Sequence, residues 1–426
     1  MRPPRSIRDE SGLVHHGALL MAGTLLGSMC NAGFHMAVGR VLPPAEYGSL
    51  VAMLGIILAA TTPMLAVQNT LAHYASKLIL EGRRDDLPGL FRHWALRFAV
   101  LSAAVGAGAV VFRQPLSVFW GGVEPALIVC TFGVLAGSLW IYLFYGLLQG
   151  VQAFAWLAFV PQAWGGVRLA LGWGLTVWVS ATALAALSAQ GAGVLAVAVL
   201  SLWAMRRMRL PDARRAFRRT SGTYRYLGSS LVCLAGYAML MNLDTALAKR
   251  YFDAETAGLF AKAATIARTA VFLPVPIATA LFPKVTSAGE MTEASWRLLG
   301  RALLLAGGIL AAVAAGCCLL PQLPWTILYG RWAPEEAAMA VALTRAMVLA
   351  MTPLALVYLL LNFEMAQRRF RWAYGLVPCS LGYVAWVALR HDTPLRIPFA
   401  LGMCSLAALV LLGLALGRQR RTAPGG

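Results

Sequence analysis

Charged residues are scarce in this chain of 426 residues. Asp, Glu, Lys and Arg make up 12% of it and hydrophobic residues 59%, whereas a soluble domain carries roughly 25% charged residues. This composition excludes an ordinary soluble enzyme, and it excludes a disordered chain, which would be polar and rich in charge. Acidic residues are rarer than basic ones: the chain has 17 Asp and Glu and 36 Lys and Arg, which gives a formal charge of +19.

The sequence also lacks the motifs of common catalytic and metal sites. It contains no P-loop, no H-E-x-x-H, no G-x-S-x-G and no C-x-x-C pattern. We therefore expect no enzymatic activity, no cofactor and no metal. The seven cysteines all lie in apolar stretches, where we expect packing rather than disulfides. They are Cys30, Cys130, Cys233, Cys317, Cys318, Cys379 and Cys404.

Long apolar stretches are the main feature of the sequence. A membrane-spanning helix needs about 20 mostly apolar residues. The sequence predicts an all-α polytopic membrane protein with about 12 transmembrane helices. The predicted spans lie near 17–38, 50–76, 95–112, 125–149, 153–178, 184–205, 227–248, 259–284, 299–320, 337–363, 373–389 and 397–417.

Basic residues in the loops predict the orientation of these spans. Twenty-five of the 36 lysines and arginines lie on the side of both termini and seven on the other. Four more, Arg168, Lys262, Arg268 and Arg345, lie inside predicted spans. We expect a multi-pass protein of the bacterial inner membrane with both termini in the cytoplasm. The positive charge then reflects insertion and attraction to anionic membrane lipids rather than nucleic-acid binding.

A weak internal repeat divides the chain into two halves. Aligning Gly48 with Gly258, an offset of 210, also pairs Arg40 with Arg250. Because each half contains an even number of helices, both enter the membrane in the same direction. A pseudo-twofold axis along the membrane normal should relate them, with a site at their interface. The predicted parts are an N-terminal six-helix lobe (1–205), a basic cytoplasmic linker (206–226), a C-terminal six-helix lobe (227–417) and a cytoplasmic tail (418–426).

Prolines inside predicted spans include Pro63, Pro274, Pro276 and Pro353. Each removes a backbone hydrogen bond and can kink its helix. We interpret them as hinge candidates for two lobes that rock about a shared cavity. The alternative is a fixed helix shape with no part in motion.

Three segments carry a family resemblance. They are GRVLPPAEYGSL at 39–50, NLDTALAKRYFDAETAGLFAKA at 242–263 and FLPVPIATALFPKV at 272–285. They resemble the polysaccharide-export and lipid-linked oligosaccharide flippases of the multidrug/oligosaccharidyl-lipid/polysaccharide (MOP) exporter superfamily. The resemblance implies a two-lobed, twelve-helix bundle whose central cavity moves a polyprenyl-pyrophosphate-linked glycan to the outer leaflet. It also implies partners in O-antigen or exopolysaccharide synthesis, namely a polysaccharide polymerase and glycosyltransferases.

Polar side chains inside the predicted spans form the candidate site, because a charge at membrane depth needs water or a partner. The interior is net basic, and guanidinium groups bind phosphate oxygens bidentately. Asp244 either joins this site or pairs structurally with Lys262 or Arg268. The predicted cavity residues are Arg168, Arg268, Arg345, Asp244, Asn31, Gln68 and Asn69.

The sequence leaves two other functions open. A small-cation or multidrug exporter of the same superfamily would need buried carboxylates, for which Asp244 is the candidate. A membrane glycosyltransferase or polymerase would need a metal site, and Asp253-Ala-Glu255 has a D-x-E pattern. Those two acids are also typical of a helix N-terminus. The sequence does not decide whether H⁺ or Na⁺ coupling drives transport; His35 and His73 are the candidate proton carriers.

Overall fold

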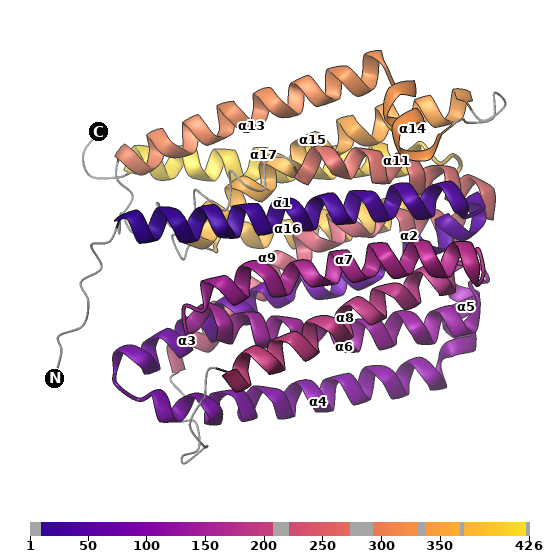
Figure 1. Ribbon diagram of the computed structural model, residues 1–426. Helices are drawn as coiled ribbons and strands as arrows, with labels where there is room; N and C mark the ends of the chain where they lie inside the picture. The colour runs from indigo at the N-terminus through magenta and orange to yellow at the C-terminus, as the bar shows by residue number, and fades with distance from the viewer. Residues whose placement is uncertain (1–9, 208–220, 273–292, 331–336, 367–369, 423–426) are drawn as a thin grey trace.

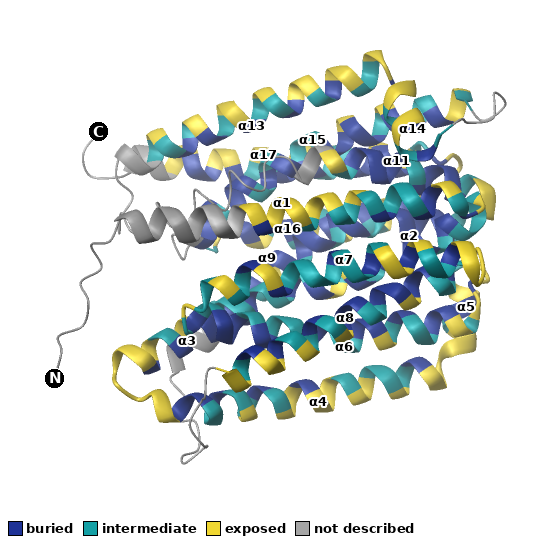
Figure 2. Ribbon diagram, viewed as in Figure 1, coloured by how far each residue is buried: buried dark blue, intermediate teal, exposed yellow. Residues whose placement is uncertain are grey.

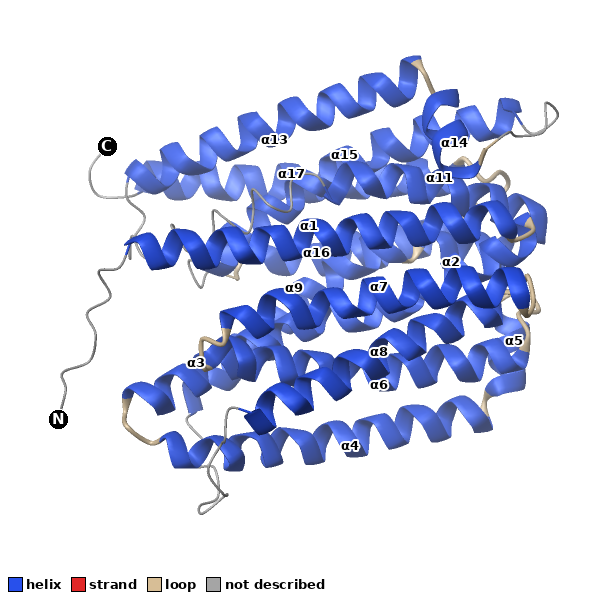
Figure 3. Cartoon of the chain, in the orientation of Figure 1, coloured by secondary structure: helices blue, strands red, loops and turns tan. Residues whose placement is uncertain are grey.

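The computed structural model describes residues 10–207, 221–272, 293–330, 337–366 and 370–422. Within these ranges the chain is helical, with short connections and no strand (Figure 3). The predicted all-α fold is therefore confirmed. Helices run nearly side by side along one direction, as expected for segments that must satisfy every backbone polar group internally in lipid (Figure 1).

Eight α-helices make up the first half of the chain. Short 3₁₀ turns separate α2 from α3 (η1, Thr62–Met64) and α3 from α4 (η2, Arg84–Asp86). The helices are α1 (Glu10–Val41), α2 (Pro44–Thr61), α3 (Leu65–Leu80), α4 (Leu87–Val111), α5 (Arg113–Phe119), α6 (Pro125–Gly150), α7 (Phe154–Trp178) and α8 (Ala183–Arg207).

The second half repeats this arrangement within the described residues. A 3₁₀ turn, η4 (Ala373–Gly375), precedes α16. The helices are α9 (Ser221–Asn242), α10 (Asp244–Tyr251), α11 (Ala254–Phe272), α13 (Glu293–Leu319), α14 (Gln322–Tyr329), α15 (Ala337–Ala366), α16 (Leu376–Leu389) and α17 (Arg396–Thr422).

Described helices lie in each of the twelve predicted spans, and residues 273–284 of the eighth span lie outside the described residues. By length and composition, seven described helical segments can cross a membrane, or eight if α9 and α10, bent by 51°, form one span. The outermost helices, α4 and α13, carry many exposed apolar side chains, such as Leu96 and Leu304 (Figure 2). Such faces suit lipid rather than water. The chain is a multi-pass membrane protein.

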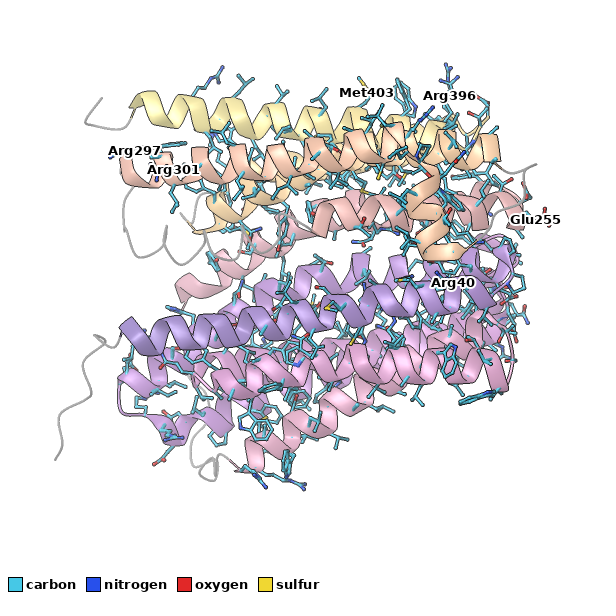
Figure 4. The ribbon with its side chains drawn as sticks, turned by 45° about the horizontal axis from the view of Figure 1, so that its top comes forward. Arg40, Glu255, Arg297, Arg301, Arg396 and Met403 are labelled. Atoms are coloured by element: carbon cyan, nitrogen blue, oxygen red, sulfur yellow. The ribbon has the colours of Figure 1, made fainter. Side chains whose placement is uncertain are left out.

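Both chain ends lie at the same end of the bundle (Figure 1), which we name the termini side; the other end is the far side. Arg297 and Arg301 lie on the termini side, whereas Arg40, Glu255 and Arg396 lie on the far side (Figure 4). This grouping agrees with the sides predicted from the loops. That the termini side faces the cytoplasm stays a prediction.

Helices pack within each of the two predicted lobes and also across them. In the N-lobe (α1–α8), α7 packs between α1 and α8, and α6 packs against α3, α4 and α8. In the C-lobe (α9–α17), α15 packs against α11, α13 and α17, and α16 against α9 and α17. The lobes meet where α2 packs against α9, α10 and α11, where η1 and α3 pack against α9, and where α1 meets α14. One hydrophobic cluster continues through both lobes.

The repeat-related glycines Gly48 and Gly258 touch each other across the lobe boundary. A Cβ on Gly48 would lie 2.9 Å from the Cα of Gly258, and one on Gly258 would lie 2.1 Å from the carbonyl oxygen of Pro44. Residues equivalent by an internal twofold can meet only near its axis. The offset of 210 therefore marks where the pseudo-twofold axis passes between the lobes.

Several boundaries differ from the sequence predictions. Helix α8 extends through Arg207 and α9 begins at Ser221, so the predicted linker 206–226 overlaps helix at both ends. Helix α17 continues into the predicted tail as far as Thr422, where basic side chains favour a helix C-terminus. Helix is present over the predicted span 227–248, but it bends by 51° at Leu243, between α9 and α10.

The predicted hinge prolines have different surroundings. Pro63 lies in the η1 turn that interrupts α2 and α3, and Pro353 lies inside α15. Pro274 and Pro276 lie outside the described residues. The sequence analysis did not single out Pro161, which lies inside α7. Proline thus interrupts or enters spans in both lobes, and motion at these points stays a prediction.

Candidate binding site between the lobes

Close packing of α1 on α7 sets the position of Arg168. A Cβ on Gly165 would lie 3.1 Å from the Cβ of Cys30, and one on Gly172 would lie 2.5 Å from the ring of Phe34. Small residues that let helix backbones approach closely are the usual means of helix association in membranes. The approach brings the Arg168 side chain of α7 onto Asn31 and Phe34 of α1.

Arg168 is a buried cation whose hydrogen bonding is incomplete. The residue is 3% exposed, and its Nη1 donates to Oδ1 of Asn31 over 2.7 Å. Its guanidinium carbon lies 3.7 Å from the ring centroid of Phe34 and 5.2 Å from that of Trp164. Within the described chain, Nε and Nη2 are buried without a hydrogen-bond partner. These two nitrogens form one edge of the guanidinium, and such an edge can hold two oxygens of one oxyanion.

A buried tyrosine joins the two lobes beside this arginine. The hydroxyl of Tyr47, from α2, donates to Oγ1 of Thr265 in α11 over 3.2 Å and lies 3.2 Å from the hydroxyl of Tyr329 in α14. The Nδ1 of His35, from α1, lies 3.1 Å from the same hydroxyl. Arg268 follows Thr265 by three residues in α11, and Arg168 contacts Phe34, the neighbour of His35 in α1. The two predicted arginines therefore lie near one polar network.

Arg268 and Asp244 form a buried ion pair in the C-lobe. Nη2 of Arg268, from α11, donates to Oδ1 of Asp244, the first residue of α10 after the bend. The Asp244 side chain is 0% exposed and that of Arg268 11%. The sequence left Lys262 or Arg268 as the partner of Asp244, and the structure shows Arg268. The Nζ of Lys262 instead lies 5.4 Å from the ring centroid of Tyr329. Nε of Arg268 and Oδ2 of Asp244 have no partner within the described chain.

The remaining predicted residues do not join this network. Arg345 is exposed on α15, and its Nε donates to the backbone oxygen of Cys318 in α13 over 2.9 Å. The amide of Gln68, from α3, donates to Oε1 of Gln149 in α6 over 3.1 Å, and Asn69 is half-buried beside it. Arg345 thus contacts α13 rather than this network, and its place in a cavity stays a prediction. A guanidinium can reach out along its apolar stem, and the depth of a residue in a span does not fix which face it takes.

Sequence reasoning missed the aromatic part of the site. The side chains of Phe34, Tyr47 and Tyr329 are largely apolar and lie in apolar helices. Composition therefore does not distinguish these residues from ordinary core residues. Tyr47 lies within the quoted GRVLPPAEYGSL segment, and its position there was the available signal. The contacts of Tyr47 with two C-lobe helices show what that segment positions.

The D-x-E pattern caps a helix. Oδ1 of Asp253 accepts the backbone N–H groups of Glu255 (3.1 Å) and Thr256 (2.9 Å), and its backbone oxygen accepts that of Ala257. This is the geometry of an N-cap residue at the start of α11. The interpretation as helix N-terminal charges is confirmed. Among the described residues no group of three or more His, Cys, Asp or Glu is arranged to hold a metal ion.

Replacing Asp253 with alanine should destabilise the protein by about 1 kcal/mol, since the cap bonds are lost. Hydrogen bonds from the side chain and backbone of Thr256 hold the pKa of the Asp253 carboxyl below its usual value. The stabilisation is then complete above the unfolded pKa of about 3.9 and is lost as the pH falls through the lower folded value. The midpoint of thermal unfolding should differ between the two proteins at pH 7 and converge in acid. Equal midpoints at pH 7 would contradict the cap.

The fold and the interface together define the class: an all-α membrane protein built from two repeat-related lobes, with a polar tyrosine contact between them and a buried arginine in each lobe. No family model and no curated relative matches the sequence. Solved structures do match. An inward-facing multidrug resistance MATE family transporter of the MOP superfamily superposes with a TM-score of 0.77 at 13% identity, covering 96% of this chain and 99% of that chain.

Two further structures have the same fold. The lipid II flippase MurJ, in an inward closed conformation, gives a TM-score of 0.71 at 10% identity over 94% of this chain and 87% of that chain. A MOP superfamily transporter from Pyrococcus furiosus, described as having a binding pocket of reverse polarity, gives a TM-score of 0.68 at 15% identity. The match covers 96% of this chain and 94% of that chain. The chain therefore has the MOP superfamily transporter fold, as the resemblance implied.

The likeness also depends on conformation. An outward-facing MATE family transporter gives a TM-score of 0.66 at 14% identity over 96% of this chain and 94% of that chain, against 0.77 for the inward-facing one.

Proposed function

We propose that this protein is a flippase or exporter that moves an anionic lipid-linked glycan across the bacterial cytoplasmic membrane by alternating access. The proposed cargo class is a polyprenyl-pyrophosphate oligosaccharide or polysaccharide precursor. The MOP transporter fold supports transport by two lobes. The choice of an anionic cargo rests on the residues of this chain, above all on Arg168.

Arg168 carries the proposal. An uncompensated charge buried in protein is costly, so such a group is retained where a ligand or partner completes it. Asn31 and Phe34 hold the guanidinium and leave its Nε–Nη2 edge unused. A phosphate group offers two oxygens at the spacing of that edge. Arg268 supplies a second guanidinium three residues after Thr265, which accepts the hydrogen bond of the Tyr47 hydroxyl.

Access to Arg168 requires helix movement. In the present conformation Nε and Nη2 are buried between α1 and α7. The cargo would therefore bind as α1 shifts on α7, in a state that opens toward the termini side. The excess of basic residues on that side supports its assignment to the cytoplasm, where lipid-linked precursors are presented.

A small-cation or multidrug exporter is the second candidate, and Asp244 favours it. This carboxylate lies at a helix break, and its Oδ2 has no partner within the described chain. Broken helices commonly form ion sites in transporters. Arg268 neutralises the charge of Asp244, however, so the pair as it stands does not attract a cation. Coupling to H⁺ or Na⁺ would act through this pair.

The test is a transport assay in vesicles that contain the purified protein. A pyrophosphate-linked glycolipid should cross the bilayer at least tenfold faster than in empty vesicles, whereas a neutral glycolipid of the same chain length should not. A cationic dye should not be expelled under an H⁺ or Na⁺ gradient. Dye export without glycolipid movement would establish the second candidate instead.

A further inference from the structure

Two short helices on the far side are a second internal repeat. The segment PLSVFWG (115–121) in and after α5 aligns with PWTILYG (324–330) in and after α14, at an offset of 209. Both end in a glycine with positive φ: Gly121 at 72° and Gly330 at 79°. Glycine adopts this conformation without the steric penalty of a side chain, and it commonly terminates helices. The two lobes therefore present equivalent short helices on the same side.

Each short helix is contacted by an arginine from the other lobe. Arg40, at the end of α1 in the N-lobe, donates from Nε to the backbone oxygen of Leu328 (3.2 Å) and from Nη2 to that of Ile327 (2.6 Å), both in α14 (Figure 4). Arg250, at the end of α10 in the C-lobe, lies with its guanidinium carbon 4.7 Å from the ring centroid of Phe119 in α5. Arg40 and Arg250 are the residues that the repeat pairs.

The chemistry of the two contacts differs. Arg40 binds the last carbonyl groups of α14, where the helix dipole is negative and carbonyls lack partners within the helix. Arg250 makes a cation–π contact, which is weaker at an exposed position. Backbone contacts lie beside each arginine: a Cβ on Gly39 would lie 2.6 Å from the ring of Tyr329, and one on Gly121 would lie 2.5 Å from the carbonyl oxygen of Lys249.

We propose that Arg40 and Arg250 form a reciprocal gate clamp, in which each lobe holds the short helix of the other and keeps the far side closed. Opening the far side by rocking the lobes must break both contacts, because each joins one lobe to the other. The clamp stabilises the inward-facing arrangement in the absence of cargo. It rests on alternating access as proposed above, but it makes no use of the anion site.

The test measures the distance across the far side directly. Spin labels on Ser180 and Asp392, exposed residues in the α7–α8 and α16–α17 connections, report the separation of the lobes by pulsed electron resonance. The labels are placed in a protein whose seven cysteines are replaced by alanine. The closed distance should dominate in the parent protein. Arg40→Gln should raise the ratio of open to closed about fivefold and Arg250→Gln about twofold, after allowing for the exposure of these contacts.

The double variant should raise the ratio about tenfold, because contacts at separate sites add. Arg390→Gln removes an exposed arginine on the same side and should leave the distances unchanged. Unchanged distances in the double variant would overturn the clamp. The distance measurement needs no cargo. If the distances change as expected but the glycolipid is not transported, the proposed function is rejected and the clamp is not.

Discussion

Arg168→Gln should reduce transport of a pyrophosphate-linked glycolipid by roughly 10- to 100-fold. The substitution removes a charged donor edge, and hydrogen bonds to charged groups contribute about 1.5–3 kcal/mol. Arg168→Lys should retain part of the activity, since an ammonium keeps the charge but lacks the planar two-donor edge. The measurement is the initial rate of glycolipid movement in vesicles at several cargo concentrations.

Arg345→Gln is the matched control. It removes an arginine from a predicted span, but an exposed one that binds a backbone oxygen of α13. Its transport rate should equal that of the parent protein. Arg168→Gln should also leave the fold intact, because it removes a buried cation that has no acidic partner among the described residues. Full activity in Arg168→Gln, or equal losses in both variants, would remove Arg168 from the proposed site.

Gly258→Val should prevent closure of the far side and lower transport at least tenfold. A Cβ at this position would lie 2.1 Å from the carbonyl oxygen of Pro44, which belongs to the other lobe and cannot move aside as a flexible side chain could. Overpacking of this kind typically costs 1–3 kcal/mol. The far-side distance between labels on Ser180 and Asp392 should lengthen in parallel with the loss of transport.

Gly133→Val controls for the effect of valine within a helix. Gly133 lies inside α6, and a Cβ there would meet nothing within 4 Å. This variant should keep both the closed distance and the transport rate. If Gly258→Val behaved in the same way, the glycine contact would have no part in closing the lobes.

The sequence predicted the approximate positions of the membrane-spanning helices, but it did not predict the break within one of them or the short helices between them. Hydrophobic length fixed the twelve spans, because lipid demands helices of that length. It gave no sign of the break at Leu243, since the NLDT segment contains neither glycine nor proline. The short helices α5 and α14 lie outside the predicted spans, although the PLSVFWG and PWTILYG segments repeat in sequence.

The candidate site was predicted in part. Arg168 and Arg268 were recognisable as charges at membrane depth, and the pairing of Asp244 was one of two stated alternatives. Arg345 was indistinguishable from them, because α15 is apolar on all sides and its periodicity does not reveal which face is buried. Whether Nε and Nη2 of Arg168 are left without a partner depends on how closely α1 approaches α7, and only the packed structure contains that information.

Because Nε and Nη2 of Arg168 have no partner within the described chain, an anion that binds there should stabilise the folded protein against heat. A ligand that binds only the folded protein stabilises it, by about 2.7 kcal/mol at one hundred times its dissociation constant. Warming the purified protein with a panel of anionic lipids would then rank cargoes by the protection that each gives. Such a screen needs neither vesicles nor knowledge of the sugar.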